Sequence, residues 1–262
     1  MNVMIMTDLE GVSGVDSIDH IFDEKLYPYA CERLMADINA AVDGCFLGGA
    51  DKVYVADGHC TGVNFIHELL DPRAIAVTVQ DYSDYIAGGK IDACMEVGAH
   101  AKAGTINAFL EHTQSSKSIF GHFVNGIECG EAAQGAIFAG AFGVPLVMVS
   151  GDVAVCKEAK EMFGDKIATA AVKKALRRNA AECMDLKEAE ELIRAAAKDG
   201  VERYKEIEPF KIDMPMTVRQ VYMRTDFCET MFDYHKGAVK RVDGRTLEKV
   251  IDKITCYRDV LI

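Results

Sequence analysis

Carboxylate and imidazole side chains recur in this sequence directly after short apolar runs or at the start of a helix-like segment. Five residues share this placement: Asp8, Glu10, His59, His100 and Glu131. Three carboxylates and two imidazoles are ligands that suit a borderline divalent ion such as zinc. One carboxylate can also bridge two such ions, which two-metal hydrolases hold about 3.5–4 Å apart.

Each of these residues also has an ordinary explanation when it is taken alone. Asp8 and Glu10 could cap a loop or face solvent, because loops are where carboxylates usually lie. A histidine beside glycine, as at His59 and His100, often hydrogen-bonds the backbone of a turn. Glu131 would be favoured at a helix N-terminus by the helix dipole. The metal hypothesis therefore depends on whether the fold brings the five together.

Strands and helices alternate in the pattern of the first ~150 residues, about the length of one domain. Apolar runs predict buried strands at residues 3–7, 52–56, 74–79, 93–97 and 145–150. Helical periodicity or small-residue composition predicts helices at residues 29–46 and 132–142. The opening strand, helix and strand form a βαβ unit, which implies parallel pairing. Ligands of such sheets bind outside the carboxyl ends of the strands, where the five candidates would meet.

The composition changes after residue 152. Helical spacing is found at residues 154–163, 171–179, 186–197 and 246–256, and residues 216–223 alternate as in a strand. The predicted fold class is α/β, with a layered, mostly parallel sheet flanked by helices and a smaller, helix-rich α+β C-terminal part. We place a metal-binding domain at residues 1–155 and a subdomain at 156–262, with a soft boundary because no linker separates them.

Charge and cysteine usage narrow the class of protein. The 262 residues include 29 Lys and Arg against 41 Asp and Glu, a formal charge of −12, which disfavours nucleic acid and anionic membranes as partners. Nine cysteines without a C-x-x-C pair suggest free thiols in a reducing compartment. The N-terminus lacks the pattern of a signal peptide, and no run of 18 apolar residues occurs, so we expect a cytoplasmic protein.

Several catalytic signatures are missing from the chain. It contains no phosphate-binding G-x-x-x-x-G-K-[ST] loop, no H-E-x-x-H and no G-x-S-x-G. No G-x-G-x-x-G follows the first strand, which disfavours a dinucleotide-binding fold of that type. Lys173-Lys174 and Arg177-Arg178 lie in the segment 171–179 and are interpreted as the solvated face of a helix.

Short motifs in a fixed order carry a resemblance over roughly residues 1–180. They are Asp8-Leu9-Glu10-Gly11, Asp57-Gly58-His59, Gly98-Ala99-His100, the isolated His112, Gly130-Glu131, and the run at residues 144–152. In this order they resemble the D-aminopeptidase family of binuclear zinc metallopeptidases. The resemblance implies an α/β fold, two zinc ions per chain and a ring-like homo-oligomer that encloses an inner chamber.

The resemblance also implies roles for individual residues. Asp8 would bridge two zinc ions, with Glu10 and His59 completing the first site. His100 and Glu131 would complete the second site. His112 matches the catalytic histidine of the family.

Three positions close to the motif residues depart from the family pattern. Met6 stands where the family has serine, Ala56 stands where asparagine is usual, and Glu111 replaces the serine before the catalytic histidine. All the ligands are unchanged. The departures therefore bear on substrate choice and on the behaviour of His112 rather than on metal binding.

The expected function is removal of an N-terminal amino acid, a D-residue, from a short peptide or amino-acid amide by a water that two zinc ions activate. Three alternatives stay open: a two-zinc hydrolase of another amide, a non-catalytic metal-binding module, and an assembly subunit whose ring is its function. Asp57 is either the partner of a ligating imidazole or a turn residue. His122 is the next candidate if His112 is not catalytic.

Overall fold

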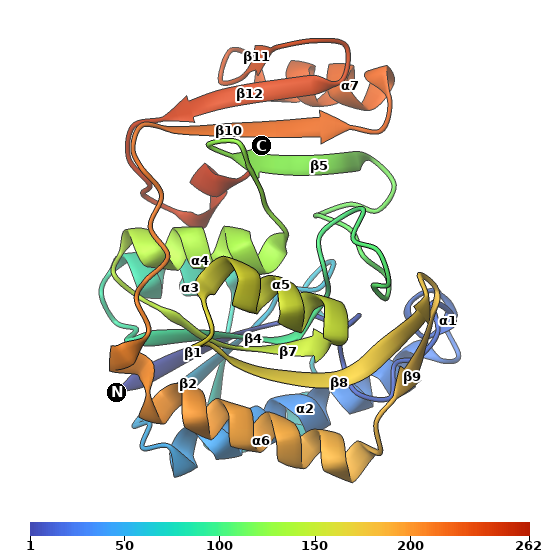
Figure 1. The fold of residues 1–262 in the computed structure, drawn as a ribbon, viewed down its shortest axis with the longest axis vertical. Helices are drawn as coiled ribbons and strands as arrows, with labels where there is room; N and C mark the ends of the chain where they lie inside the picture. Colours follow the sequence, from blue (N-terminus) through green and yellow to red (C-terminus); the bar gives the residue numbers. More distant parts are fainter.

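The computed structural model describes residues 1–262 and contains two sheets (Figure 1). The larger, sheet A, has the strand order β3-β2-β1-β4-β7-β8-β9. Its strands are β1 (Asn2–Thr7), β2 (Lys52–Asp57), β3 (Ala74–Val77), β4 (Ala93–Ala99), β7 (Leu146–Asp152), β8 (Ala168–Arg177) and β9 (Ala180–Cys183). Every neighbouring pair is parallel except β8 and β9. The predicted α/β fold with a mostly parallel sheet is therefore confirmed.

Helices cover both faces of sheet A (Figure 1). α2 (Tyr27–Leu47) and α6 (Leu186–Glu202) lie on one face, and α3 (Val79–Ala87), α4 (Glu131–Ala141) and α5 (Val153–Phe163) lie on the other. Each face has its own core, with 34 buried residues on the α2 side and 28 on the α4 side. Strands buried on both faces read as continuous apolar runs, which is why the sequence predicted them.

Sheet B is antiparallel and lies beyond α4, so that α4 is between the two sheets (Figure 1). Its strand order is β11-β12-β10-β5-β6. The strands are β5 (Ile119–Val124), β6 (Ile127–Glu128), β10 (Met216–Tyr222), β11 (Lys240–Arg241) and β12 (Thr246–Ile251). Val124, Met216 and Val218 belong to the same buried cluster as Ile137 of α4. The second sheet is thereby joined to the first through a shared core.

Short elements complete the chain. They are the helices α1 (Asp19–Phe22) and α7 (Thr225–His235), and the 3₁₀ turns η1 (His67–Leu69), η2 (Tyr204–Glu206) and η3 (Tyr257–Val260). Cys228 of α7 is buried with Tyr222 and Leu247 of sheet B. No helix has both the length and the apolar character needed to cross a membrane.

Two predicted helices are strands in the structure. Residues 171–179 fall largely in β8, which pairs with β7 and β9, and residues 246–251 form β12, which pairs with β10. Both segments mix alanine, leucine or lysine at helical spacing, which favours a helix locally. Pairing with a neighbouring strand overrides that weak preference.

The division into domains at residues 1–155 and 156–262 stays a prediction. Each of the two sheets contains strands from both sides of residue 155. Sheet A takes β8 and β9 from beyond residue 155. Sheet B takes β5 and β6 from before it. The smaller layer is thus built from two stretches that are distant in the sequence.

His122 joins sheet B to the C-terminal turn. The side chain of His122 is fully buried, and its Nε2 lies 2.9 Å from the carbonyl oxygen of Val260. Its Nδ1 lies 3.4 Å from Oε1 of Gln220. Burial lowers the pKa of His122, because the charged imidazole would lose its hydration. The residue is a structural contact and is not among those that line the pocket described below.

Replacing His122 with glutamine should remove a pH-dependent part of the stability. A histidine whose pKa is depressed by folding stabilises the fold above its unfolded value of about 6.5, and this stability is lost as pH falls below that value. The wild type should therefore lose up to about 1.4 kcal/mol per pH unit relative to His122→Gln between pH 6.5 and pH 5. Urea unfolding at several pH values measures the difference. A constant difference would show that folding does not change the pKa of His122.

Candidate metal centre

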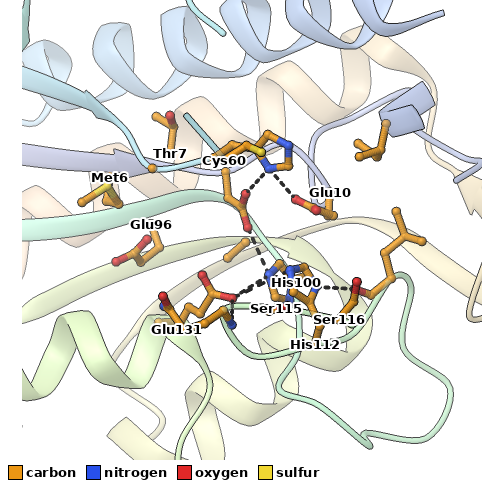
Figure 2. A pocket seen from close by; sticks show the side chains of 18 of the residues that line it. Met6, Thr7, Glu10, Cys60, Glu96, His100, His112, Ser115, Ser116 and Glu131 are labelled. Atoms are coloured by element: carbon orange, nitrogen blue, oxygen red, sulfur yellow. Dashed lines mark hydrogen bonds and ion pairs between the residues drawn. The ribbon is translucent and has the colours of Figure 1, made fainter. Parts of the chain in front are cut away.

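The fold brings the five predicted ligands together at one edge of sheet A, and Figure 2 labels Glu10, His100 and Glu131 among them. Strands β2, β1 and β4 are neighbours, and their carboxyl ends lie side by side. The five residues follow these strands or begin α4: His59 after β2, Asp8 and Glu10 after β1, His100 after β4, and Glu131 as the first residue of α4. Their convergence follows directly from the strand order.

The two oxygens of the Asp8 carboxylate face two different groups. Oδ1 lies 2.9 Å from Nδ1 of His59, which is also 3.0 Å from Oε2 of Glu10. Oδ2 lies 3.2 Å from Nε2 of His100, which is 3.3 Å from Oε1 of Glu131. Asp8 is therefore placed between a Glu10–His59 half and a His100–Glu131 half, as a bridging carboxylate would be.

The protonation of this cluster is controlled by its opposite charges. Burial alone would raise the pKa of Asp8, but the hydrogen bond from His59 and the charge of His100 overcome it and lower that pKa. Burial alone would lower the pKa of His59, but the hydrogen bond to Asp8 and the nearby negative charge of Glu10 raise it to about 11. Contacts with Glu131 and Asp8 likewise raise the pKa of His100 against the effect of burial. The carboxylates thus favour positive charge on the groups beside them.

The donor set fits divalent cations. Oε2 of Glu10 is buried and has no hydrogen bond, since its approach to His59 lacks hydrogen-bond geometry. Nitrogen and oxygen donors within reach of one another occur as two sets that share His100, one with Asp8 and Glu10 and one with His112 and Glu131. Carboxylates beside imidazoles are among the usual ligands of zinc in proteins.

His112 lies against the second half of this cluster. Its ring stacks on that of His100, with centroids 3.9 Å apart and planes inclined by 9°. Its Nε2 lies 3.9 Å from Oε1 of Glu131, and its Nδ1 lies 2.8 Å from the carbonyl oxygen of Leu110. Since a carbonyl only accepts, Nδ1 carries the proton, and the Nε2 lone pair is left on the side of the cluster.

Two further residues fix the loops that carry the ligands. Asp57 accepts hydrogen bonds from the backbone N–H of His59 and from both the backbone N–H and the side-chain amide of Asn64. It therefore shapes the turn after β2 rather than holding an imidazole. Ser13 donates its N–H and hydroxyl to the buried Asp37 of α2, which anchors the loop after β1.

Lys173 contradicts its interpretation as part of a solvated face. It lies on β8, its side chain is buried, and Nζ donates to the carbonyl oxygens of Glu10 and Val15 at 2.8 and 2.6 Å. Burial lowers its pKa to about 8. The residue was misplaced because the helix predicted for residues 171–179 would have turned it to solvent. Lys173 holds the loop that presents Asp8 and Glu10.

Glu96 was not singled out from the sequence. It lies on β4, it is 8% exposed, and burial together with the nearby charges of Asp8 and Glu131 raises its pKa. An acid inside an otherwise apolar strand was the signal that could have identified it, because such residues are rarely buried without a reason.

The cluster opens into a pocket of about 690 Å³, within the range of pockets that bind small ligands. The ligand cluster, His112 and Glu96 line it together with Tyr82, Tyr257 and Arg178. Tyr257 comes from η3 near the C-terminus. The pocket is therefore formed by residues near the carboxyl ends of sheet A, by the start of α4, by the loop after β4 and by the C-terminal segment.

Comparison with known proteins shows which family the chain belongs to. The family model described as D-aminopeptidase matches residues 1–260. The chain belongs to the D-aminopeptidase family. A D-aminopeptidase of Bacillus subtilis (strain 168) is 29% identical over 222 residues, which cover 80% of this chain and 77% of the relative.

A solved member of the family has the same fold. It is a Zn-dependent D-aminopeptidase, DppA, from Bacillus subtilis, described as a self-compartmentalizing protease. It superposes with a TM-score of 0.89 at 21% identity, over 99% of this chain and 95% of that protein. The family resemblance found in the motifs is thereby confirmed.

Proposed function

We propose that this protein is a metal-dependent aminopeptidase that removes an N-terminal D-amino acid from short peptides or amino-acid amides, with two zinc ions per chain. The observation that carries the proposal is the placement of Asp8, whose two carboxylate oxygens face separate acid–imidazole pairs inside a pocket. Membership of the D-aminopeptidase family supports the same chemistry.

The ligand roles follow the two halves of the cluster. Glu10 and His59 would hold one ion, His100 and Glu131 would hold the other, and Asp8 would contact both. Bound zinc ions would polarise the scissile carbonyl and make a bound water acidic, with a pKa near 7. Lys173 and Asp57 keep the ligand loops in place through the backbone of Glu10 and His59.

His112 is proposed to move a proton. Its Nδ1 is occupied by the carbonyl of Leu110, so Nε2 is the atom that can accept a proton and later donate it to the leaving amine. Its backbone N–H is bonded to the carbonyl of Ala101, one residue after His100. The ring is therefore held beside the cluster rather than being free to swing away.

Assembly and location are proposed along with the activity. A ring-like homo-oligomer that encloses the active sites is supported by the description of the solved relative as self-compartmentalizing. Large apolar side chains at the surface, among them Ile106, Val63 and Tyr234, support it too. A cytoplasmic location is supported by the nine cysteines, all of which are free.

Release of amino acid from a panel of substrates tests the function. D- and L-aminoacyl amides and dipeptides should be compared before and after a chelator removes the metal. The expected result is release from D-alanyl substrates that stops on chelation and returns with zinc. If every substrate is left intact by the zinc-loaded protein, the peptidase function is wrong. A different amide, or metal binding without catalysis, would then be the better explanation.

Metal content tests the bridging role of Asp8. Because both halves share this carboxylate, Asp8→Ala should lose both ions, whereas Glu10→Ala or His59→Ala should chiefly weaken one. Elemental analysis of the purified variants, after dialysis against a weak chelator, gives ions per chain. Retention of two ions by Asp8→Ala would exclude a bridge at this position.

Substitution of His112 separates catalysis from ligation. If His112 only moves a proton, His112→Ala should keep both ions and lower kcat by about 10²–10⁴, the usual contribution of a positioned acid–base group. Steady-state kinetics and elemental analysis on one preparation measure both quantities. Loss of an ion from this variant would instead make His112 a ligand of the second half, which its distance to Glu131 also permits.

A further inference from the structure

Glu96 is a buried carboxyl group that the protein leaves without a partner. The residue lies on β4 and is 8% exposed, and its carboxyl oxygens reach the pocket without a hydrogen bond or ion pair to another group of the chain. Neither oxygen is fully enclosed by the protein, so a donor on a ligand in the pocket can reach them. Most polar side chains of buried residues have a hydrogen-bond partner within the protein, which makes this carboxyl group unusual.

The fold makes room for this carboxyl instead of filling the space around it. A Cβ atom at Gly135 of α4 would lie 2.7 Å from Oε1 of Glu96, so any larger residue there would displace the group. Gly135 is one helical turn after Glu131, so the same face of α4 presents both toward β4. Glu96 consequently lies on the Glu131 side of the metal cluster, as Figure 2 shows.

Aromatic rings form the rest of this corner of the pocket. Tyr82 and Tyr257 line the pocket with Glu96, and their rings meet edge to face with centroids 5.7 Å apart. The same Cβ position at Gly135 would lie 3.4 Å from the hydroxyl of Tyr82, which places that hydroxyl near the carboxyl. A carboxylate beside aromatic rings is a favourable environment for an ammonium group.

The cations that line the pocket do not contact Glu96. Arg178 is paired with Glu111, at 2.9 Å, and Lys117 and Arg258 are exposed. His100 is engaged by Asp8 and Glu131. No cationic side chain of the protein therefore pairs with Glu96.

We propose that Glu96 binds a primary ammonium group of the substrate. This inference rests on the proposed function, because every aminopeptidase substrate carries such a group next to the bond that is cut. The ammonium would donate to the unpaired carboxylate and lie against Tyr82 and Tyr257. It is either the α-amino group or an amine in the side chain of the first residue.

The experiment compares wild type with Glu96→Gln on three amides, those of D-alanine, D-norleucine and D-lysine. Glutamine keeps the shape and removes the charge. KM should rise by about 10- to 100-fold, as expected for a lost charge-assisted hydrogen bond, with kcat changed less. A rise for all three amides assigns Glu96 to the α-amino group, and a rise for the lysine amide alone assigns it to the side-chain amine. An unchanged KM for all three overturns the proposal.

Further variants separate binding from folding. Glu96→Asp, which keeps the charge, should recover part of the affinity, and Glu182→Gln, at an exposed glutamate of β9, should leave KM unchanged. The melting temperature of Glu96→Gln should be no lower than that of wild type, because no internal hydrogen bond is lost. A lower melting temperature together with an unchanged KM would make Glu96 a structural residue.

The ammonium site can be tested even if the proposed peptidase function is wrong. If wild type hydrolyses none of the amides, calorimetric binding of D-alanine amide and D-lysine amide to the zinc-loaded proteins replaces kinetics. Weaker binding of either amide by Glu96→Gln than by wild type supports an ammonium site. Equal binding of both amides by the two proteins overturns it, whatever reaction the protein catalyses.

Discussion

The structure depends on a concentration of negative charge at one edge of a parallel sheet. Asp8, Glu10 and Glu131 are brought within a few ångströms of two imidazoles, and Glu10 and both imidazoles are buried at the base of a pocket. Like charges this close repel strongly unless cations lie between them. The cluster therefore makes sense as a cation site, and the rest of the fold serves to hold it.

Three parts of the chain hold the cluster from different directions. The strand order places β1 between β2 and β4, so each ligand loop emerges beside the next. Lys173 of β8 and Asp37 of α2 fix the loop after β1 through its backbone and Ser13. The C-terminal turn η3 lies on another side and brings Tyr257 into the pocket, and His122 of sheet B contacts the carbonyl oxygen of Val260 in that turn. Rigid elements thus orient the ligands before any ion arrives.

The ligands could be predicted from sequence because strand, loop and ligand are close together in it. An apolar run followed at once by an acid or a histidine needs only the rule that parallel strands present their carboxyl ends at one edge. His112 lacked such a signal and was placed by resemblance alone. Glu96 was missed because β4 is buried on both faces and its sequence does not alternate between apolar and polar residues. The sequence therefore did not show which residues of β4 face the pocket.

The elements that were wrongly predicted as helices depend on contacts between residues distant in the sequence. β8 and β12 have helical spacing, and only their partners β7, β9 and β10 make them strands. Lys173 was misread for the same reason. The contact between His122 and Gln220 joins residues 98 positions apart, and no local sequence pattern predicts it. Local propensity is a weak guide wherever such pairing decides the structure.

Anomalous X-ray scattering at the zinc edge, from crystals of the zinc-loaded protein, tests most directly whether Asp8 lies between two ions. The expected map has two peaks of similar height about 3.5–4 Å apart, the spacing of two-metal hydrolases, with one oxygen of Asp8 directed at each. A single peak, or a second peak that Asp8 does not contact, would contradict the shared-carboxylate centre on which the proposed chemistry depends.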